Sequence, residues 1–521
     1  MEEKFVKYPV GVQDFEKLIT EGYIYVDKTA ILYDLVKKGN CYFLSRPRRF
    51  GKSLTLSTLK AYFEGKKHLF KDLAIEKLEK DWKKHPVFLI SFARFEKNEE
   101  MSLEDILDFY LRDWEKIYEI ESSNKNYANR FAAVIQKSVE ITGEKAVVLV
   151  DEYDSALVST LKDKALHEKM KNILKPFYTV LKDFDSHIQF ALIAGITRFS
   201  RMTIFSGLNN LNDISLNRSY SEICGITEGE LESNFHQGIG ELGQYYGLGF
   251  HETLAELKGY YDGYHFTEES ADIYNPFSIL HALSSRKISN YWFATGIPSF
   301  IADRMKSQDL DLEKYMNQSA TENILKEADS AYTSDLAILF QAGFLTIKGF
   351  DRFDGRYRLG IPNREVREGL STLFMEKFLY ADTNQGYMLI LDMNEAIRKG
   401  DPERFLTLLK GFFSGVPFEM CKGDKEIYFH NAFYIITNLI GLRVQTERHV
   451  STGSIDLVLS TPDFVYVIEI KLNKKPQIAL DQINSKDYAL PWIADHRKIF
   501  KIGVSFSSRT RTLGKWIIES T

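Results

Sequence analysis

Short apolar runs alternate with longer amphipathic stretches through the first half of the chain. The apolar runs lack the polar residue at every second position that a half-exposed strand shows, which indicates strands buried on both faces. Strands are predicted at Cys41–Leu44, Val87–Phe92, Ala146–Val150, Ile188–Ala194 and Asp213–Leu216, and helices at Lys52–Phe63, Leu103–Tyr118, Tyr127–Ile141 and Leu166–Lys182. This order predicts an α/β fold in which helices cover both faces of a parallel sheet.

The chain is long enough for more than one such core. At 521 residues it exceeds the roughly 250–300 residues at which a single hydrophobic core stops growing. After Gly225 helical patterns replace the strands, as expected for a helical lid. Strands at Leu345–Phe350 and Arg356–Ile361, joined by a turn, predict a winged helix that either binds DNA or packs within the protein. We expect domains at 1–290 and 381–521, with a connector at 291–380.

A second α/β core is predicted near the C-terminus. Its strands are expected at Arg443–Thr446, Ile455–Ser460, Val465–Ile470 and Ile499–Ser505, with a helix at Gln477–Tyr488. The sequence contains no internal repeat or low-complexity tract, so both cores are expected to be ordered.

Composition excludes several classes of protein. The net charge of −5 and pI near 6.2 exclude a histone-like basic average, so contact with nucleic acid requires a local patch. The three cysteines have no C-x-x-C spacing, which argues against a disulfide framework or a cysteine zinc site. No run reaches the roughly 18 apolar residues of a membrane span, and the first residues lack the apolar core of a signal peptide. We therefore expect a cytoplasmic protein with no membrane partner.

A phosphate-binding loop is predicted between the first strand and the helix that follows it. Gly51, Lys52 and Ser53 match the end of the pattern G-x-x-x-x-G-K-[ST], while Arg46 occupies the position of its first glycine. Gly51 permits close backbone approach to phosphates, Lys52 neutralises them and Ser53 ligates Mg²⁺. The alternative is a solvated basic turn. The expected ATP contacts in the loop are Arg48, Arg49, Gly51, Lys52 and Ser53.

Two acids end the third predicted strand, in the manner of a Walker B element. Asp151 is expected to hold Mg²⁺ through water, and Glu152 to orient or deprotonate the attacking water. The next strand leads into Thr197 and Arg198, where a hydroxyl and a cation can sense the γ-phosphate. Either Arg198 or Arg201 is then a sensor or an arginine finger, or it bridges two subdomains. The alternative for the acids is a strand that ends in solvated carboxylates.

A second set of charged residues lies on the C-terminal strands. Asp456 is followed after twelve residues by Glu469 and Lys471, which share one face of a strand because side chains alternate. Two carboxylates can hold Mg²⁺ or Mn²⁺ at a phosphodiester, and the lysine can steady the attacking water or the developing charge. Glu426 is either a third metal ligand or a first-turn helix acid. The following helix carries Gln482, Lys486 and Tyr488 as candidate contacts to a nucleic-acid backbone.

Several motifs together carry a resemblance to a known family. They are Arg46–Ser53, Val150–Asp154, Tyr261–Phe266, Tyr274–Ser278, and Gly453–Asp456 with Glu469–Lys471. The chain resembles bacterial AAA-ATPase-like proteins fused to a nuclease domain of the PD-(D/E)xK superfamily. The resemblance implies a P-loop NTPase domain that ends near residue 290, a restriction-endonuclease-like C-terminal domain, and arginine as the usual residue at position 46. For Tyr264 and His265, which lie in one of the motifs, we expect a packing role.

These features predict an ATPase coupled to a metal-dependent nuclease that acts on DNA or RNA, with ATP and Mg²⁺ as cofactors. Its catalytic residues are expected to be Glu152, Asp456, Glu469 and Lys471, and its metal ligands Ser53, Asp151, Glu426, Asp456 and Glu469. The alternative is a nucleotide-switched nucleic-acid-binding or signalling protein with a silent nuclease core. A P-loop kinase is a third hypothesis, which Glu152 beside Asp151 disfavours. A homo-oligomer is compatible with each of these hypotheses.

Overall fold

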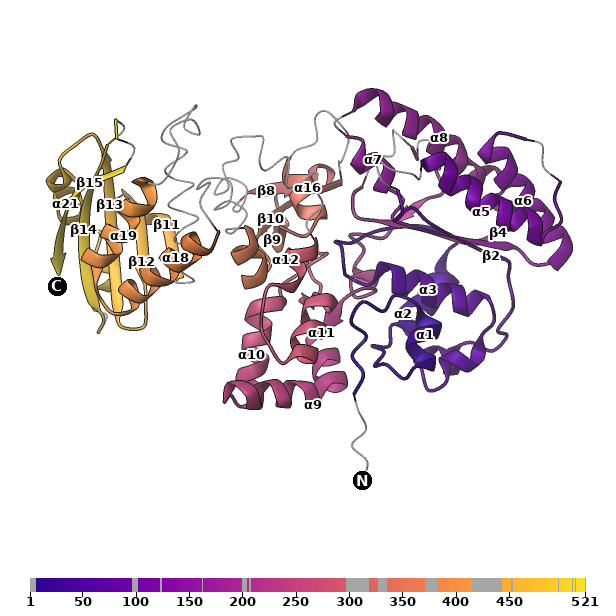
Figure 1. The fold of residues 1–521 in the computed structure, drawn as a ribbon, viewed down its shortest axis with the longest axis horizontal. Helices are drawn as coiled ribbons and strands as arrows, with labels where there is room; N and C mark the ends of the chain where they lie inside the picture. The colour runs from indigo at the N-terminus through magenta and orange to yellow at the C-terminus, as the bar shows by residue number, and fades with distance from the viewer. Residues whose placement is uncertain are drawn as a thin grey trace. The chain divides into compact units, whose positions relative to one another are not determined.

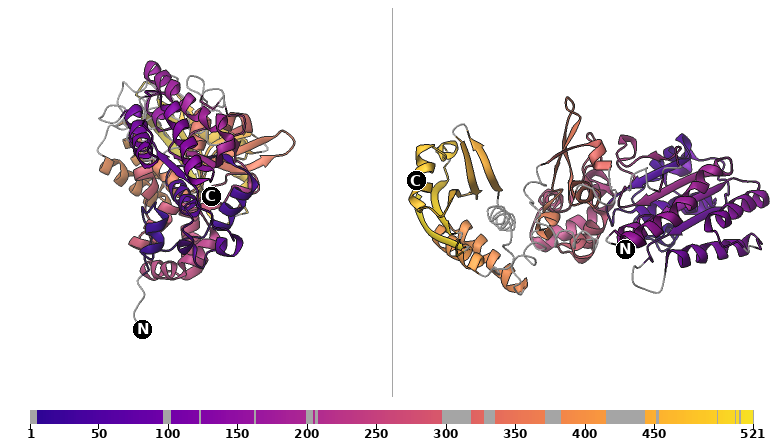
Figure 2. Two further views of the ribbon diagram at one scale, coloured as in Figure 1. Left: turned by 90° about the vertical axis from the view of Figure 1, so that its right-hand side faces the viewer. Right: turned by 90° about the horizontal axis from the view of Figure 1, so that it is seen from above.

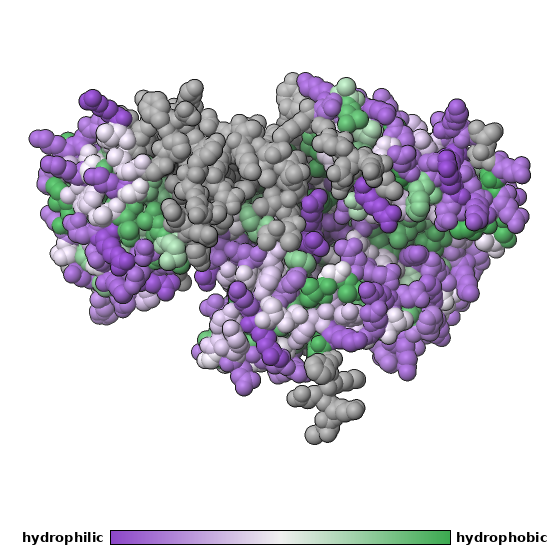
Figure 3. Space-filling model, in the orientation of Figure 1, coloured by the Kyte–Doolittle hydropathy of each residue, from purple (hydrophilic) through white to green (hydrophobic). Residues whose placement is uncertain are grey.

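The computed structural model describes residues 6–95, 102–121, 124–161, 163–198, 204–205, 208–296, 318–326, 335–370, 383–414, 443–450, 453–494, 496–507, 509–510 and 512–520 (Figure 1). The chain forms two compact units: unit 1 comprises Met1–Arg304 and Tyr315–Val366, and unit 2 comprises Met305–Lys314 and Arg367–Thr521. Hydrophilic residues cover most of the described surface on the face shown in Figure 3. Among the described residues, no helix is both long and apolar enough to cross a membrane.

Unit 1 is built on the predicted parallel sheet, whose strand order is β2-β3-β4-β1-β5. The strands are β1 (Cys41–Ser45), β2 (Val87–Ser91), β3 (Ala146–Asp151), β4 (Ile188–Gly195) and β5 (Asn212–Asp213). Every residue of β1 and β3 is buried, as the unbroken apolar runs predicted. The strand β4 lies between β1 and β3, so the phosphate-binding loop, the sensor segment and the acid pair all follow the carboxyl ends of adjacent strands.

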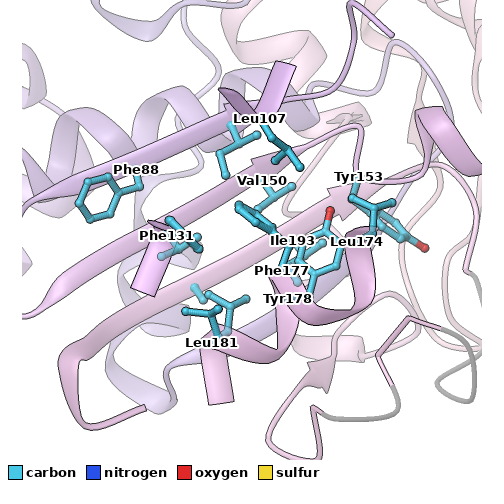
Figure 4. Packing of buried hydrophobic residues seen from close by; sticks show 14 of the residues in the cluster. Phe88, Leu107, Phe131, Val150, Tyr153, Leu174, Phe177, Tyr178, Leu181 and Ile193 are labelled. Carbon is cyan, nitrogen blue, oxygen red and sulfur yellow. The ribbon is translucent and has the colours of Figure 1, made fainter. Parts of the chain in front are cut away.

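Helices pack on both faces of this sheet. One face is covered by α5 (Leu103–Ile117), α6 (Tyr127–Thr142) and α8 (Lys164–Asp183), and Figure 4 shows Leu107, Phe131 and Phe177 from these helices packed over Val150 and Ile193. The helix α3 (Lys52–Phe63) follows the phosphate-binding loop, and the ring of its Phe63 packs against Phe190 of β4. The shorter elements are α1 (Phe15–Thr20), α2 (Thr29–Lys38), η1 (Lys67–Phe70), α4 (Ala74–Leu78), α7 (Ser155–Ser159), η2 (Asp185–His187) and η3 (Arg218–Tyr220). The predicted helix and strand bounds are confirmed to within two residues, except that the fifth strand is shorter.

A helical lid follows the sheet, as expected after Gly225. It contains α9 (Glu228–Tyr246), α10 (Phe250–Tyr261), α11 (Pro276–Ser285) and α12 (Tyr291–Gly296), with a short antiparallel ladder between β6 (Ile226–Thr227) and β7 (Ile273–Tyr274). These helices share their own core, and the N-terminal residues Tyr8, Val10, Ile24 and Val26 pack against it. The N-terminal segment therefore joins the lid to the part of unit 1 that contains the parallel sheet.

The last part of unit 1 has the arrangement of a winged helix. Two helices, α15 (Glu322–Lys326) and α16 (Asp335–Gln341), lie in sequence between β8 (Ser319–Thr321) and the hairpin of β9 (Thr346–Asp351) and β10 (Arg356–Gly360). The strands form an antiparallel sheet in the order β8-β10-β9. In winged helices that bind DNA, the helix before the hairpin enters the groove. Here that helix is α16, and its residues 336–341 are buried, so it packs within unit 1.

Unit 2 contains the second predicted core. Its sheet has the order β11-β12-β13-β14-β15, with β13 and β14 parallel and the other pairs antiparallel. The elements are α18 (Thr383–Arg398), α19 (Pro402–Ser414), β11 (Arg443–Val450), β12 (Gly453–Ser460), β13 (Phe464–Leu472), α21 (Pro476–Ser485), η5 (Leu490–Trp492), β14 (Lys498–Ser507) and β15 (Thr512–Ser520). The strand β15 was not predicted from the sequence, and α21 ends three residues earlier than predicted.

Candidate nucleotide and nuclease sites

The phosphate-binding loop connects β1 to α3 and relies on two residues with positive φ. Gly51, with φ +98°, precedes the first residue of α3, and Arg49 has φ +68°. A residue with a Cβ is strained at such angles, which explains the glycine at position 51. The N-terminus of α3 follows at once, and its free backbone N–H groups favour an anion. The local chain therefore has the geometry that a phosphate requires.

Lys52 and Ser53 contact the loop itself and the end of β3. The Lys52 Nζ donates to the carbonyls of Arg46 and Pro47 at 2.9 and 3.0 Å, so it lies against the loop. Burial lowers the pKa of this ammonium group, although the nearby carboxylates of Asp151 and Glu152 oppose that shift. The Ser53 Oγ donates to Asp151 Oδ2 at 2.6 Å. These contacts join the loop to the acidic end of β3, where a Mg²⁺ between serine and aspartate is expected.

Arg46, at the position of the missing first glycine, has a structural role. Its side chain is 1% exposed and donates to four backbone carbonyls, those of Ser45, Ser215, Tyr220 and Ser221. Its guanidinium carbon lies 4.0 Å from the centre of the Phe266 ring. Burial lowers the pKa of Arg46 to about 10. The loop thus keeps its shape through a buried arginine where the common pattern has a glycine.

Asp151 and Glu152 stand at the carboxyl end of β3. Asp151 is 8% exposed, and its Oδ1 accepts the backbone N–H of Glu152 at 3.0 Å. Glu152 has φ +49°, a backbone conformation uncommon for a residue with a side chain. Burial and the adjacent Asp151 carboxylate raise the pKa of Glu152 above its usual value. A raised pKa suits a group that accepts a proton near neutral pH.

Asp154, for which the sequence pattern predicted no role, organises the segment that contains Thr197 and Arg198. Its Oδ2 accepts the backbone N–H and the Oγ1–H of Thr197 at 2.7 and 2.5 Å. Arg198 is 4% exposed and forms an ion pair with Asp213 of β5, while its backbone N–H donates to Gln341 Oε1 at 2.8 Å. Gln341 belongs to α16. Arg198 thus lies beside the phosphate-binding loop and also joins the sheet to the winged helix.

Aromatic residues of the lid contact the phosphate-binding loop. The buried Phe50 ring meets Tyr264 and Phe266 edge-on, with centroids 4.8 and 5.5 Å apart. Trp292 Nε1 donates to the Arg48 carbonyl at 3.1 Å, and the Arg49 guanidinium lies 4.6 Å from the centre of the Phe277 ring. These contacts fix the loop from the lid side, in agreement with the packing role expected for Tyr264.

His265 has a different set of contacts from its neighbour Tyr264. Its Nε2 is paired with Asp272 at 2.6 Å, and its backbone N–H donates to Thr346 Oγ1 of β9 at 2.7 Å. The contact with Asp272 lies within the lid, and the contact with Thr346 connects the lid to the winged helix. His265 therefore has a structural role.

An apolar pocket opens beside Gly51. Three parts of unit 1 line it: the N-terminal segment, the start of α3, and the lid. Its lining includes Ile24, Val26, Thr55, Ile226, Phe235 and Leu280. Lys28 is also among the lining residues, and its Nζ donates to both carboxylate oxygens of Glu230 at 2.6 Å. A mainly apolar lining of this kind is typical of sites that take small molecules.

The charged residues of unit 2 meet where two strands separate. The ladder of β12 with β13 runs from the Ser460–Val465 pair to the Leu457–Ile468 pair. Beyond the Leu457–Ile468 pair, a side chain takes the place of a backbone acceptor. The Asp456 Oδ2 accepts the backbone N–H of Ile470 at 2.8 Å. The carboxylate of Asp456 is thereby fixed beside β13, as the hairpin arrangement predicted.

Glu469 is the most buried member of this site. Its side chain is 1% exposed, and its Oε1 accepts from Lys471 Nζ at 2.8 Å and from Gln482 Nε2 at 2.6 Å. Burial and the charge of Asp456 raise the pKa of Glu469, although Lys471 opposes the shift. Its Oε2 is buried and makes no hydrogen bond with any described residue. A buried carboxylate oxygen without a donor fits a divalent cation, so Asp456 and Glu469 suit a metal.

Two candidates from the sequence lie outside the described residues: Glu426 and Arg201. Among the residues with described positions, no group of three or more histidine, cysteine, aspartate or glutamate side chains could hold a metal. Gln482 lies in the site, yet it donates to Glu469 and to the Tyr488 hydroxyl, the latter at 3.3 Å. In this structure it orients a carboxylate. The contact of Gln482 with a nucleic-acid backbone, suggested by the sequence, stays a prediction.

Comparisons with known proteins place these two sites in context. Residues 9–205 match the family model described as predicted AAA-ATPase, and residues 424–516 match that of the PD-(D/E)XK nuclease superfamily. An uncharacterized protein in the vnfD 5′ region of Azotobacter chroococcum mcd 1 is 34% identical over 531 aligned positions, which cover 99% of each chain. The similarity therefore extends over both sites and the residues between them.

Proposed function

Because this chain belongs to the family of predicted AAA-ATPases that carry a C-terminal PD-(D/E)XK nuclease superfamily domain, we propose that it binds and hydrolyses ATP in unit 1. We further propose that unit 2 cleaves phosphodiester bonds of nucleic acid with the help of a divalent metal. Since ATP and nucleic acid are both substrates in this proposal, the cytoplasm is the proposed location.

One observation carries the ATPase proposal: the Ser53–Asp151 hydrogen bond of 2.6 Å beside the Lys52 ammonium group. In the nucleotide complex, Lys52 moves from the loop carbonyls to the β- and γ-phosphates, whose charge restores its full basicity. Ser53 and Asp151 then share the Mg²⁺ site. The apolar pocket beside Gly51 receives the base.

Hydrolysis requires a base near the γ-phosphate, and this proposal gives that role to Glu152. It accepts a proton from the attacking water as the oxygen bonds to the γ-phosphorus. The bond from that phosphorus to the β,γ-bridging oxygen then breaks, and ADP and phosphate leave. Its raised pKa, caused by burial and by Asp151, makes proton acceptance more favourable near neutral pH.

The nuclease proposal is supported mainly by the partnerless Oε2 of Glu469. A bound Mg²⁺ or Mn²⁺ supplies a Lewis acid for the phosphate and a more acidic water. Asp456 and Glu469 hold the cation, while the amide of Gln482 orients Glu469. Lys471 stabilises either the charge that develops on the phosphate or the attacking water. Its ammonium group does not ligate the metal and lies beside Glu469.

A silent nuclease core is the second candidate, and one observation favours it. Lys471 and Gln482 already satisfy the Oε1 of Glu469, as in a structural ion pair. Metal binding separates the two candidates: a silent core keeps this pair and takes up no divalent cation, whereas a nuclease binds Mg²⁺ or Mn²⁺ through Asp456 and Glu469.

The ATPase proposal is tested with Lys52→Ala and Glu152→Gln in the full chain. Lys52→Ala should lose ATP binding in calorimetry. Glu152→Gln should bind ATP but hydrolyse it about 10²- to 10⁴-fold more slowly, because the amide cannot accept the proton. Lys60→Ala is a matched control, since Lys60 lies half-exposed on the same helix and is paired with Glu64. Normal ATP turnover by Lys52→Ala would exclude this loop as the nucleotide site.

The nuclease proposal is tested with Asp456→Asn, Glu469→Gln and Lys471→Ala against labelled single- and double-stranded DNA and RNA. The first two variants should lose Mn²⁺ binding and cleavage while ATP hydrolysis persists. Lys471→Ala should bind the metal but fail to cleave, because a cation ligates no metal. Glu519→Gln, which changes a carboxylate on β15 that accepts from Asn484, is the control. If the wild type binds no Mn²⁺ and cleaves no substrate, the silent core is correct.

A further inference from the structure

The hairpin of β9 and β10 projects from the helices of unit 1 in both views of Figure 2. We call residues 346–360 the wing. It contains four basic residues and two acidic residues, against a net charge of −5 for the whole chain. In a winged helix, the helix before the hairpin usually contacts DNA. Here that helix is α16, whose residues are buried within unit 1 and therefore cannot reach DNA. The wing, in contrast to α16, has exposed residues on both of its strands.

One face of the wing sheet is basic and polar. Arg356 and Arg358 are exposed on β10, on the face opposite to the buried Tyr357 and Leu359. The register pairs Arg356 with Thr321 and Arg358 with Ser319, so exposed hydroxyl residues flank both arginines. Arginines two residues apart on a strand are separated by roughly 7 Å. Two guanidinium groups at this spacing, beside hydroxyl groups, suit successive phosphates of one nucleic-acid strand.

The two arginines are open to a new partner. Asp351 lies opposite Arg356 in the register, yet its Oδ1 accepts the backbone N–H groups of Phe353 and Asp354 at 2.8 and 3.3 Å. Within the described chain, neither Arg356 nor Arg358 takes part in an ion pair. Arg358 instead lies along β9, where its NH2 group donates to the Lys348 carbonyl at 3.4 Å and comes within 2.9 Å of the position that a Cβ on Gly349 would occupy. Gly349 therefore makes space for a guanidinium group flat on the sheet.

The tip of the wing presents an aromatic ring to solvent. Phe353 is 101% exposed, the highest value among the large apolar residues described as exposed. A two-stranded β-ribbon is narrow enough to enter a groove of a duplex, and an apolar side chain at its tip can wedge between base pairs. A single exposed phenylalanine is common on proteins. This one differs in that it lies at the tip of a projecting hairpin that also carries two exposed arginines without a described ion pair.

The wing contacts the lid both near its tip and at its base. Arg352 is paired with Glu269 at 2.5 Å, and Arg218 is paired with both Glu268 and Glu269 at 2.6 Å. Lys348 Nζ donates to the carbonyls of Gly263 and Pro362 at 3.2 and 3.0 Å. These contacts attach the hairpin of β9 and β10 to the lid, so the backbone that carries Arg356, Arg358 and Phe353 has a defined position within unit 1. A defined backbone position lowers the entropic cost of binding a partner.

From this geometry we propose that the wing binds a nucleic-acid duplex, with Arg356 and Arg358 on the phosphates and Phe353 in a groove. The inference goes beyond the proposed cleavage, because it assigns duplex binding to unit 1. It requires no metal and no catalysis. Its failure is therefore distinguishable from failure of the nuclease proposal.

The test measures fluorescence anisotropy of the full chain with duplex DNA of about 20 base pairs, roughly two helical turns, in EDTA over a range of KCl concentrations. Duplex RNA and each single strand are further probes. The double variant Arg356→Ala/Arg358→Ala should lower the slope of log Kd against log salt by about two, one for each lost phosphate contact. Phe353→Ala should weaken duplex binding about tenfold at fixed salt and leave the slope unchanged, because it carries no charge.

The matched control is Arg112→Ala, since Arg112 is an exposed arginine on α5 whose partner is Asp108. It should leave the affinity and the slope unchanged, and all variants should keep the wild-type circular dichroism and melting temperature. The proposal is wrong if the wing variants bind duplexes like the wild type, or if the wild type binds only single strands or no nucleic acid. Binding to DNA duplexes, RNA duplexes or both supports it and defines the partner.

Discussion

Glu365 provides the sharpest prediction about the stability of unit 1. Its side chain is fully buried, and its carboxylate accepts from Ser278 Oγ at 2.8 Å and from the Trp292 backbone N–H at 2.7 Å. Burial outweighs these donors and raises the pKa of Glu365 to about 7 from its usual 4.5. Glu365→Gln replaces the carboxyl with a neutral group of the same shape. The amide oxygen can still accept from Trp292.

The sign of the effect follows from proton binding. Between about pH 4.5 and about pH 7 the folded chain holds a proton on Glu365 that the unfolded chain has lost. Stability in the wild type therefore falls as pH rises through this window. At about 1.4 kcal/mol per pKa unit, the loss is on the order of 3 kcal/mol. Asp262, whose pKa burial also raises to about 7, adds a loss in the same direction that the Glu365 variant keeps.

Scanning calorimetry of wild type and Glu365→Gln at about pH 5 and about pH 8 measures this difference. The two proteins should melt together at the lower pH, and the variant should melt several degrees higher at the upper pH. Infrared spectroscopy should show a protonated carboxyl band in the wild type near pH 6 that is weaker in the variant. Glu256→Gln, an exposed change on α10, should have no effect. An equal melting difference at both pH values would refute the assignment of a buried, proton-binding Glu365.

Three further predictions concern single side chains of the two sites. Arg46→Met should cost about 3 kcal/mol or more in urea denaturation, because four backbone carbonyls lose their donor; a stable variant that fails to bind ATP would instead make Arg46 a nucleotide ligand. Phe50→Ala should cost about 3–5 kcal/mol by leaving a cavity beside Tyr264; a melting temperature like that of the wild type would contradict the packing. Gln482→Ala removes a donor that favours the charged form of Glu469, so its pKa should rise further and calorimetric Mn²⁺ binding should shift to higher pH; an unshifted pH profile would exclude the orienting role.

The elements of the fold were predictable from the sequence because burial dictated their patterns. The strands β1 and β3 are buried at every position, so their unbroken apolar runs identified them. The strand β15 was missed because its polar and small residues give no comparable run, and its partner β14 supplies the pairing. The helix α16 shows the same limit. Its sequence predicts a helix, but only the packed unit shows that the helix is buried.

The candidate sites were predictable as residue types at a given spacing, but their side-chain partners were not. Glu469 and Lys471 meet as alternation on a strand predicts. Asp154 could not be assigned, because its partner Thr197 is forty-three positions away and joins it only through the neighbouring strand. Arg198 has its ion-pair partner on β5, which the sequence placed only roughly. Spacing defines local geometry, whereas partners depend on which strands become neighbours.

The contact between Arg198 and α16 has a practical consequence for dissecting the protein. A fragment that stops near residue 290 would lack Gln341, which accepts the backbone N–H of Arg198. It would also lack Gly343, which approaches Pro47 of the phosphate-binding loop, and Phe344, whose ring lies 5.4 Å from that of Trp292. The apolar surface that α16 covers would then face water and favour aggregation. Expression of the nucleotide-binding part alone should therefore begin with fragments that extend to Val366, where the compact unit ends.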